Sequence, residues 1–345
     1  MPALPAPVLT TRHLNRALLA RQLLLERVDL PITEAIEQVG GLQTQYSPSG
    51  YVGLWTRLAG FRRNALTEAL QDRSVVQATL LRTTIHMVSR REFWPYALGI
   101  REARRAWGLR VGAFTSETRT AEGAQRLREE LAGGPKTVKE LGDIAAGFLG
   151  LVGLWVDLVR VPPSGTWERR RADRLGLAVD WVGPPDSSED DGLCHLVRAH
   201  LRAFGPAPWG DVSKWAGVPV AALKRGAAGL DLVRYRDEAG RELLDLPDAP
   251  LPDPETPAPV RFLPHWDATM LVHARRTGIL PEALRPSVFS SKNPFSVGTV
   301  LVDGRVAARW SVRDARVVVE PVTPLAADDA DEVERERAAL EAFHA

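Results

Sequence analysis

Two glutamines separated by one residue, Gln43 and Gln45, follow a glycine pair at positions 40 and 41. Their amides do not ionise near neutral pH, but each carbonyl oxygen accepts hydrogen bonds and each NH2 group donates two. Such a pair can hold a water molecule and orient a partner without exchanging a proton. It suits a hydrolysis whose leaving group is already good, so that the protein need only position water and protect a developing cation. The alternative is two polar residues on the surface of a helix or loop.

Composition limits the class of protein. The chain has 345 residues, a net charge of +1 and 45% hydrophobic residues, which fits two or three globular domains. No run of 18 apolar residues predicts a membrane span, and the N-terminus does not have the pattern of a signal peptide. Cys194 is the only cysteine, so neither a disulfide framework nor a cysteine-based zinc site is expected. We expect a cytoplasmic protein without metal or cofactor.

The basic residues are unevenly distributed. Lysine occurs at only five positions, so most of the 44 basic residues are arginines. A GC-rich genome explains this bias, and bidentate contacts to phosphate are the functional alternative. The acidic residues gather in three stretches, 188–191, 245–255 and 328–336, which leaves a basic remainder around 57–174. A surface for nucleic acid can therefore exist within a nearly neutral total.

Three segments share one order of predicted elements: short helices, a strand, a turn rich in Arg or Gly, and a second strand. The first segment is predicted to hold helices at 11–26, 31–39, 51–58 and 64–71, and strands at 75–79 and 82–88. The second is predicted to hold a helix at 121–131, a capping box at 137–140 that opens another helix, an apolar stretch at 154–161, a turn at 162–165 and a return strand at 166–170.

The third segment shows the pattern most clearly. Helices are expected at 193–204, 211–217 and 221–229, and strands at 232–235 and 242–246 flank a hairpin tip. This order is that of a winged helix, in which the second and third helices form a helix-turn-helix. After a proline-rich linker at 248–259, the Asp-Gly pair at 303 and 304 lies between two β-rich runs and predicts a hairpin. Residues 328–345 form a predicted charged helix.

These patterns predict a mainly α fold with small β-hairpins (α+β), built from tandem winged-helix motifs. We assign 8–115 to a first winged helix with the glutamine pair, 116–187 to a second, 188–250 to a third, and 258–345 to a C-terminal α/β segment with a DNA-contacting hairpin.

The repeated winged helices, the Gln-x-Gln tripeptide, the segments 81–88 and 160–167, and the Asp-Gly hairpin occur together in one order. In this combination the sequence resembles the winged-helix bacterial DNA glycosylases of the AlkZ/YcaQ-like, azinomycin-resistance type. The resemblance covers nearly the whole chain and implies a C-shaped protein that encloses double-stranded DNA carrying alkylated guanine or adenine. It implies excision of N7-alkylated purines and unhooking of interstrand crosslinks, with Gln43 and Gln45 as the catalytic pair. The middle residue, Thr44, is more polar than is usual in this family.

Alkylation at N7 explains why two amides can suffice. The modified guanine is a cation, its glycosidic bond is weakened, and its departure restores a neutral base. A water held near C1′ completes the reaction through an oxocarbenium-like transition state. We expect Gln45 to contact this water and Gln43 to orient it or the sugar-phosphate, although the two roles can be exchanged. No lysine lies near the pair in the sequence, so we expect a monofunctional enzyme.

Further residues are candidates for DNA binding. Strand alternation would place Arg82, Thr84 and His86 on one face, although a histidine in an apolar strand is more often structural. The turn and arginine run of the second segment could straddle a DNA backbone, or form a solvated surface with a core tryptophan. Arginines on a projecting hairpin could enter the minor groove, or lie on an exposed edge. These last two groups comprise Ser164, Trp167, Arg169, Arg170, Arg305 and Arg309.

A non-catalytic winged-helix regulator is the main alternative. Its recognition helix would need base-reading residues, and the third segment offers only the bland sequence 221–228. A protein that merely sequesters an alkylating agent would need an aromatic cage, which the sequence does not reveal. We expect a monomer in the cytoplasm, associated with the nucleoid, with an open channel rather than deep base flipping. The sequence does not distinguish self-resistance from general repair, nor does it identify the preferred lesion.

Overall fold

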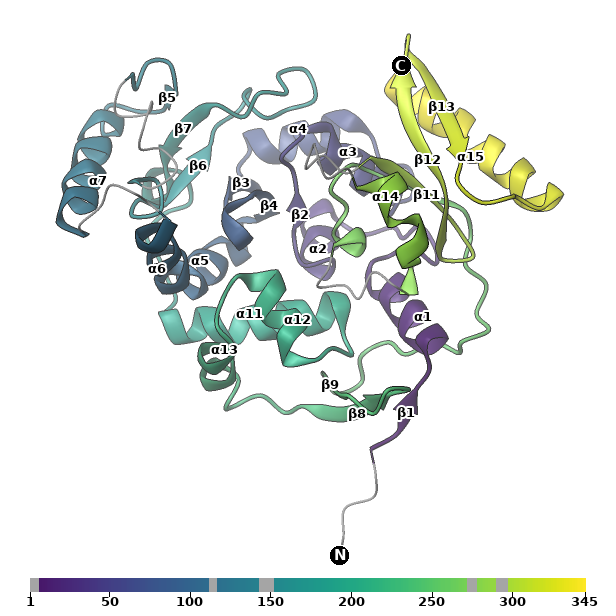
Figure 1. Ribbon diagram of the computed structural model, residues 1–345. Coiled ribbons are helices and arrows are strands. Elements are labelled where there is room, and N and C mark those ends of the chain that lie inside the picture. The colour runs from purple at the N-terminus through teal and green to yellow at the C-terminus, as the bar shows by residue number, and fades with distance from the viewer. Residues whose placement is uncertain (1–5, 112–116, 143–151, 272–277, 290–296) are drawn as a thin grey trace, which may run out of the picture.

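A computed structural model describes residues 6–111, 117–142, 152–271, 278–289 and 297–345 (Figure 1). The fold is a mixture of helices and three small sheets. In Figure 1, α7 (Glu117–Leu131) lies on one side of the molecule and the C-terminal helix α15 (Ala327–His344) on the other. Strands β2 (Leu42–Gln43), β3 (Val75–Thr79) and β4 (Ile85–Ser89) lie between them. Among the described residues, no helix is both long and apolar enough to cross a membrane.

The largest sheet joins the first two predicted segments. Its strand order is β2-β4-β3-β6-β7-β5, and every neighbouring pair is antiparallel. The pairing of β3 with β6 crosses the predicted boundary at residue 115, so the two segments share one continuous sheet. In sheet order, the strands are Leu42–Gln43, Ile85–Ser89, Val75–Thr79, Leu158–Arg160, Arg174–Leu177 and Lys136–Thr137.

The helices of the first segment lie near the predicted positions. Helix α1 ends at Arg21, before the predicted end at residue 26, and Leu23 then adopts a positive φ of 55°. The predicted strand 82–88 is wrong at its beginning. Residues 81–83 form the 3-10 turn η1, in which Arg82 has a φ of 53°, and the strand begins only at Ile85. The helices are α1 (Thr11–Arg21), α2 (Ile32–Gln38), α3 (Pro48–Trp55), α4 (Arg63–Gln71), α5 (Arg90–Gly99) and α6 (Arg101–Val111).

The second segment confirms the helix at 121–131 within α7, and its capping box forms. The Thr137 hydroxyl accepts from the backbone N–H of Glu140 at 3.2 Å, and the Glu140 carboxylate accepts from the backbone N–H of Thr137 at 2.6 Å. The helix that this box would open falls largely in residues 143–151, outside the described residues. The predicted return strand 166–170 is wrong, because residues 161–173 form a loop and the chain returns as β7.

The third segment has the predicted order of elements: α11 (Glu189–Phe204), α12 (Trp209–Ala216), α13 (Val220–Gly226), β8 (Val233–Asp237) and β9 (Glu242–Asp245). Helix α12 ends at Gly217, whose left-handed φ of 73° suits glycine. The N-terminal strand β1 (Val8–Leu9) adds to this hairpin in parallel with β8. A short helix, α10 (Ala178–Trp181), connects the second segment to α11.

The C-terminal segment contains the predicted Asp-Gly hairpin. Strands β10 (Arg261–Leu263), β11 (Gly298–Val302), β12 (Arg305–Arg313) and β13 (Arg316–Pro321) form one antiparallel sheet in that order. Short helical turns precede β11, namely η2 (Ala268–Met270), η5 (Glu282–Leu284) and α14 (Arg285–Val288). Helix α15 packs along β13 and confirms the predicted charged helix.

Buried ion pairs connect distant parts of the chain. Arg21 of α1 donates two bonds to the carboxylate of Asp245 in β9, at 2.6 and 2.7 Å. Arg57 pairs with Asp267 at 2.9 Å, and both side chains are buried. The main hydrophobic core likewise draws residues from all four predicted units. These units therefore pack against one another as parts of one structure, and their exact boundaries stay predictions.

Candidate active site

The chain reaches the glutamine pair through a turn that only glycine adopts easily. Gly40 and Gly41 have φ angles of 76° and 83°, and a Cβ on Gly40 would lie 3.1 Å from the Cβ of Ala203. The short strand β2 follows and pairs with β4, so that Gln43 lies opposite His86. The strand ends at Gln43, and Gln45 lies in the bend that follows, so strand alternation does not extend to Gln45.

The side chain of Gln43 is buried and held by an arginine. Its Oε1 accepts a hydrogen bond from Nη2 of Arg82 at 2.9 Å, while Nη1 of Arg82 donates to the backbone carbonyl of Trp215 at the end of α12. A guanidinium only donates, so the carbonyl of Gln43 must face it and the amide NH2 must face away. Among the described residues, this NH2 has no recorded hydrogen-bond partner.

Gln45 is exposed, and it is held by the backbone of the neighbouring strand. The N–H of Ile85 at the start of β4 donates to Oε1 of Gln45 at 2.6 Å, next to the backbone bond from Thr44 N–H to the Ile85 carbonyl. The side chain of Gln45 thus takes the place of a backbone acceptor for β4 just beyond the end of β2. Because an N–H cannot accept, the orientation of this amide is also determined. The carbonyl keeps a second lone pair, and the NH2 points away from the strand.

A second layer of contacts fixes the tripeptide from behind. The hydroxyl of Thr44 is buried and accepts from Nε2 of Gln77 in β3 at 3.0 Å. Gly165, in the loop between β6 and β7, lies so close that a Cβ there would be 2.1 Å from Oε1 of Gln77. The polar Thr44 therefore has a structural partner. The loop of the second segment supports the site of the first.

The charges around the pair are constant near neutral pH. Burial lowers the pKa of Arg82 to about 10, so this guanidinium remains a cation. Burial, and then the charge of Arg82, lower the pKa of His86 to about 3, so this imidazole is neutral. No carboxylate within the described part of the chain pairs with Arg82. The site is thus two oriented amides beside one cation and one neutral histidine.

Of the other predicted residues, Arg82, Thr84 and His86 lie in this region, and each of them makes hydrogen bonds within the protein. His86 is 3% exposed and bonds through Nδ1 to the Thr84 carbonyl at 3.0 Å. Thr84 donates its hydroxyl to the Leu81 carbonyl at 3.0 Å. Arg82 lies in the turn, so the strand alternation expected for these three residues does not hold. Their contact with DNA stays a prediction.

In the loop of the second segment, the buried hydroxyl of Ser164 donates to the Arg171 carbonyl and accepts from the N–H groups of residues 173 and 174. Trp167 is buried against Tyr51 and Phe343, as in the core alternative. Arg170 is exposed and donates to the hydroxyl of Tyr46 at 3.1 Å. Arg169 is exposed too. Of this group, the two arginines are the most accessible to DNA.

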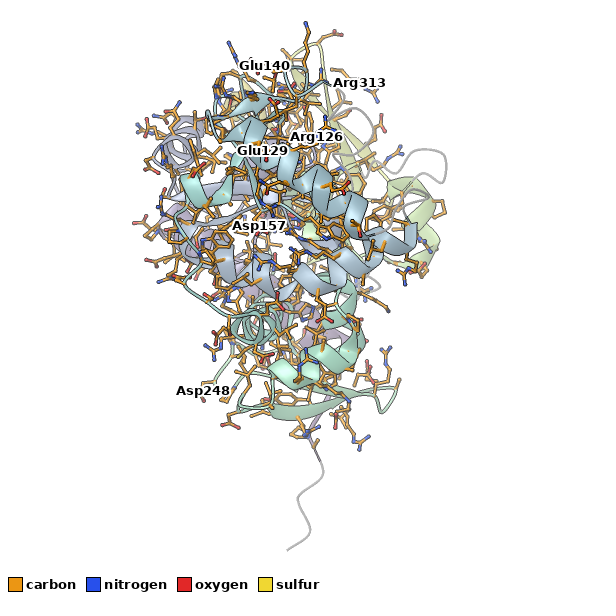
Figure 2. All side chains as sticks on the ribbon, turned by 90° about the vertical axis from the view of Figure 1, so that its left-hand side faces the viewer. Arg126, Glu129, Glu140, Asp157, Asp248 and Arg313 are labelled. Atoms are coloured by element: carbon orange, nitrogen blue, oxygen red, sulfur yellow. The ribbon has the colours of Figure 1, made fainter. Side chains whose placement is uncertain are left out.

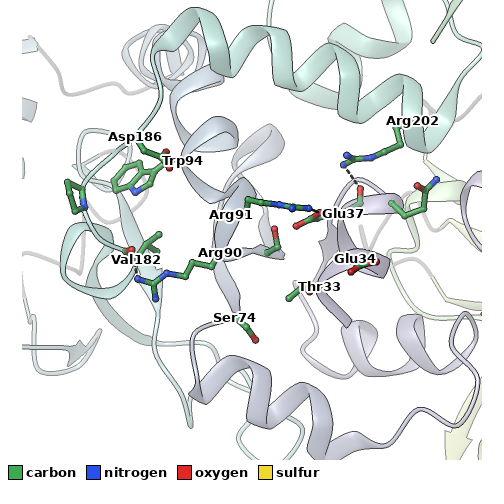
Figure 3. A pocket seen from close by; sticks show the side chains of 13 residues that line it. Thr33, Glu34, Glu37, Ser74, Arg90, Arg91, Trp94, Val182, Asp186 and Arg202 are labelled. Atoms are coloured by element: carbon green, nitrogen blue, oxygen red, sulfur yellow. Dashed lines mark hydrogen bonds and ion pairs between the residues drawn. The ribbon is translucent and has the colours of Figure 1, made fainter. Parts of the chain in front are cut away.

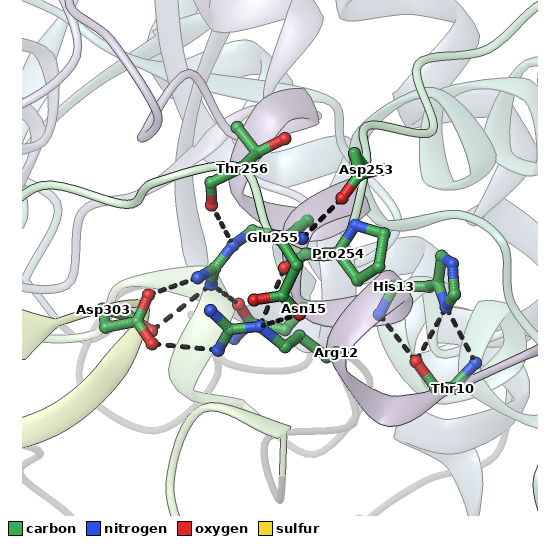
Figure 4. A network of polar contacts seen from close by, with 10 residues as sticks. Thr10, Arg12, His13, Asn15, Asp253, Pro254, Glu255, Thr256 and Asp303 are labelled. Carbon is green, nitrogen blue, oxygen red and sulfur yellow. Dashed lines mark hydrogen bonds and ion pairs between the residues drawn. The ribbon is translucent and has the colours of Figure 1, made fainter.

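The Asp-Gly hairpin does not project as expected. Asp303 pairs with Arg12 and Arg16 of α1, and Asn15 donates to the Gly304 carbonyl at 2.9 Å (Figure 4). The tip is therefore docked on α1. Arg305 is exposed and, within the described ranges, has no recorded polar partner, so its contact with DNA stays a prediction.

Arg309 donates to the Ser287 carbonyl at 3.1 Å and to Glu320 at 2.9 Å, so much of its bonding capacity is used within the protein. The opposite end of β12 carries Arg313 at an exposed turn. In Figure 2, Arg313 and Glu140 lie toward one end of the molecule and Asp248 toward the other.

A cavity of about 790 Å³ lies elsewhere in the described part of the chain, and neither Gln43 nor Gln45 lines it (Figure 3). It lies between α2 and α5. Two of its arginines are bound to the protein: Arg91 pairs with Glu37, and Arg202 donates to the Glu37 carbonyl and to Glu92, which lies outside the lining. Size alone therefore does not identify a candidate site, and we base ours on the arrangement of the two amides.

Sequence reasoning missed the residues that support the pair. Gln77 is a polar residue in the otherwise apolar strand 75–78, and this interruption was a usable signal. The Trp215 carbonyl had none, because a backbone acceptor from the third segment cannot be seen in the sequence. Tyr46, directly after Gln45, contacts His265 with ring centroids 5.5 Å apart.

Comparisons with known proteins agree with this fold. Residues 36–343 match the family model described as DNA glycosylase AlkZ-like. The structure is similar to that of Streptomyces sahachiroi DNA glycosylase AlkZ, with a TM-score of 0.78 and 19% sequence identity, over 98% of this chain and 97% of that one. A search of curated protein sequences gives no match. Because the family model covers most of its length, the chain belongs to the AlkZ-like DNA glycosylase family.

Proposed function

We propose that the protein excises N7-alkylated purines from duplex DNA and unhooks interstrand crosslinks formed by bifunctional alkylating agents. The observation that carries this proposal is the fixed orientation of two neighbouring amides. Each carbonyl is held by a donor of the protein, from Arg82 and from Ile85, while neither NH2 group has a recorded hydrogen-bond partner in the described part of the chain. Groups that are oriented before the substrate arrives need no reorganisation during the reaction.

The two glutamines have different parts in this reaction. Gln45 is exposed, and the second lone pair of its carbonyl can accept a hydrogen from the attacking water. The buried Gln43 can donate from its NH2 to the same water or to the sugar-phosphate. Arg82 positions Gln43, and its remaining donors can bind a DNA phosphate. The water attacks C1′, the bond to N9 breaks, and the electron pair of that bond neutralises the cationic base. The proton that the attacking water loses passes to the bulk solvent, because neither amide accepts it.

The architecture that we propose around this site is three tandem winged helices that form a C-shaped channel for DNA. The order of α11, α12, α13, β8 and β9 supports this interpretation for the third unit. Arg169, Arg170 and Arg305 are the arginines whose exposure best suits phosphate contacts. Without a lysine among the contacts of the two glutamines in the described residues, we propose monofunctional chemistry. We also propose that the enzyme acts as a monomer.

The test is incubation of the protein with a duplex that carries one N7-methylguanine, followed by alkali and measurement of strand scission at the lesion. A duplex crosslinked between two guanines serves as the second substrate. We expect scission at both lesions and none in undamaged duplex. A protein that binds these duplexes but leaves every glycosidic bond intact would instead be the non-catalytic regulator.

A further inference from the structure

A small pocket with aromatic walls lies next to the glutamine pair. Its volume is about 260 Å³, and it is formed where α3, the residues after β10, strand β12 and the end of α15 meet. Tyr46, one residue after Gln45, forms part of its wall. Pockets for drug-sized ligands begin at about 300 Å³, so this one suits a single nucleobase.

Four rings surround this pocket in a connected series. Tyr46 and His265 meet edge to face at 5.5 Å, His265 and Trp310 at 6.0 Å, and Trp310 and His344 at 6.0 Å. These rings come from four separate parts of the chain. Aromatic side chains beside nucleic acid bind unstacked bases through their faces, whatever the base.

The pocket also contains polar atoms that have no protein partner among the described residues. Ser49 is 2% exposed, and its hydroxyl makes no hydrogen bond. Nε2 of His344 is buried and likewise unpaired. A buried polar group without a partner destabilises a protein, so such groups are uncommon unless a ligand satisfies them. A purine offers both donors and acceptors on its edges.

The histidines of the pocket are neutral. Burial lowers the pKa of His265, and burial together with Arg170 and Arg63 lowers the pKa of His344 to about 4. Neutral rings do not repel an alkylated purine, which carries a positive charge until the bond breaks. The nearby guanidinium groups favour the neutral base over the cation, so the pocket binds the departing base better than the bound lesion.

We infer that this pocket receives the N7-alkylated purine after it has left the base stack, with its edge on Ser49 and its face against the aromatic rings. The inference rests on the proposed function and extends it. Base and sugar are joined by one bond, so a base in the pocket holds its C1′ close to Gln45, the residue before Tyr46. The expectation of an open channel without base flipping then applies only to lesions that cannot leave the stack.

Crosslinks are such lesions. A guanine that is tied through N7 to the opposite strand cannot enter a pocket of this size, so its excision proceeds without the pocket. Single-base lesions and crosslinks therefore use the same glutamines but differ in their need for Ser49 and Tyr46. The ratio of the two excision rates measures the contribution of the pocket.

The experiment compares single-turnover excision of N7-methylguanine and unhooking of a crosslink by each variant. Ser49→Ala removes the unpaired hydroxyl, and we expect the methylguanine rate to fall about 5- to 10-fold more than the crosslink rate. Tyr46→Leu removes a ring, with an expected difference on the order of 10-fold. Tyr46→Phe restores the ring and should recover the rate. Thr299→Val is the matched control, because it removes another buried hydroxyl without a recorded partner, outside the pocket.

A purely structural role predicts the opposite result. If Ser49 only fills space, Ser49→Ala removes an unsatisfied group and should leave the melting temperature and both rates unchanged or improved. Equal rates for the two lesions in every variant, or an equal loss on both, would overturn the inference. A wild-type protein that excises neither lesion would instead refute the proposed function.

A second measurement does not depend on cleavage or on crosslinks. In a Gln45→Ala background, a 2-aminopurine beside the N7-methylguanine should brighten on binding, because its neighbour leaves the stack. Tyr46→Leu in the same background should abolish the increase while the protein still binds the duplex. A duplex with unmodified guanine at that position is the control. No brightening at the lesion in the Gln45→Ala protein would also overturn the inference.

Discussion

The loop of Gln43 and Gln45 and the hairpin of Arg305 and Arg309 were both predicted to meet DNA, and the structure treats them differently. In the loop, protein donors hold both amide carbonyls, and the NH2 groups have no recorded partner within the described ranges. In the hairpin, the Asp303-Gly304 tip is docked on α1 and Arg309 is bonded to residue 287 and to Glu320.

The difference gives a criterion for choosing candidate functional residues. A side chain that is fixed by some of its bonds and keeps others free can act on a substrate at little entropic cost. A side chain that makes most of its bonds within the protein contributes mainly to stability. By this criterion the glutamines belong to the first kind, and Arg309 and Asp303 to the second. Arg305 is exposed and has no recorded polar partner among the described residues, so it belongs to neither kind.

The largest expected effect comes from the loop. Gln45→Ala and Gln43→Ala should each lower the single-turnover rate on N7-methylguanine by about 100- to 1000-fold, the usual loss when one oriented group of a catalytic site is removed. Binding of the damaged duplex should change little, because neither amide is charged. Gel-shift titrations beside the rates would check this, and unchanged rates in both variants would remove the pair from the mechanism.

A smaller effect is expected at the docked tip, on stability. Asp303→Ala leaves the buried Arg16 without its carboxylate, and we expect a loss of about 1–3 kcal/mol in the free energy of unfolding. Urea denaturation gives this value. Glu255→Ala is the control, because its pair with Arg12 is exposed and should contribute less than about 1 kcal/mol. Equal losses in both variants would contradict a docked tip.

Within β12, two arginines sharpen the comparison further. If Arg305 binds a phosphate, Arg305→Ala should reduce by about 1 the slope of the logarithm of the DNA association constant against that of salt concentration. Arg309→Ala should leave this slope unchanged and lower stability instead, since its partners are in the protein. Fluorescence anisotropy at several salt concentrations distinguishes the two, and a reversed order would show that bonding in the free protein does not predict DNA contact.

The smallest expected effect is that of pH. Neither glutamine titrates. His86 gains a proton only as pH falls toward about 3, and Arg82 loses one only as pH rises toward about 10. The rate on N7-methylguanine should therefore stay level between roughly pH 5 and 9. A bell-shaped profile with a midpoint near neutrality would reveal an acid or base that the two amides do not provide.

Much of the fold was predictable because local signals agreed with it. The order of elements in 188–250, the helix at the C-terminus and the Asp-Gly hairpin all follow from periodicity and turn residues. The return strand after Trp167 was misplaced, because the turn at 162–165 is followed by a longer loop whose position depends on Tyr51 and Phe343. Contacts of this range leave no periodic pattern in a sequence.

The candidate site could be proposed from the sequence at its center but not in its surroundings. The tripeptide and the family resemblance pointed to Gln43 and Gln45, whose catalytic role stays a prediction. The positive φ of Arg82, which turns its guanidinium to Gln43, could not be foreseen from a stretch that resembles a strand. The support from Gln77 and from the Trp215 carbonyl depends on packing between segments, and so do the four rings beside Gln45.

The first two predicted segments, divided at residue 115, share one sheet, and this affects how the protein can be cut into fragments. A fragment that stopped there would expose the hydrogen-bonding edge of β3 that pairs with β6. It would also expose the surface of Gln77 against which the Gly165 loop packs. Such a fragment would aggregate through this strand edge and would be inactive. Two fragments that are divided at residue 115 and expressed together could instead associate through the pairing of β3 with β6, and recovery of excision activity would show that they had done so.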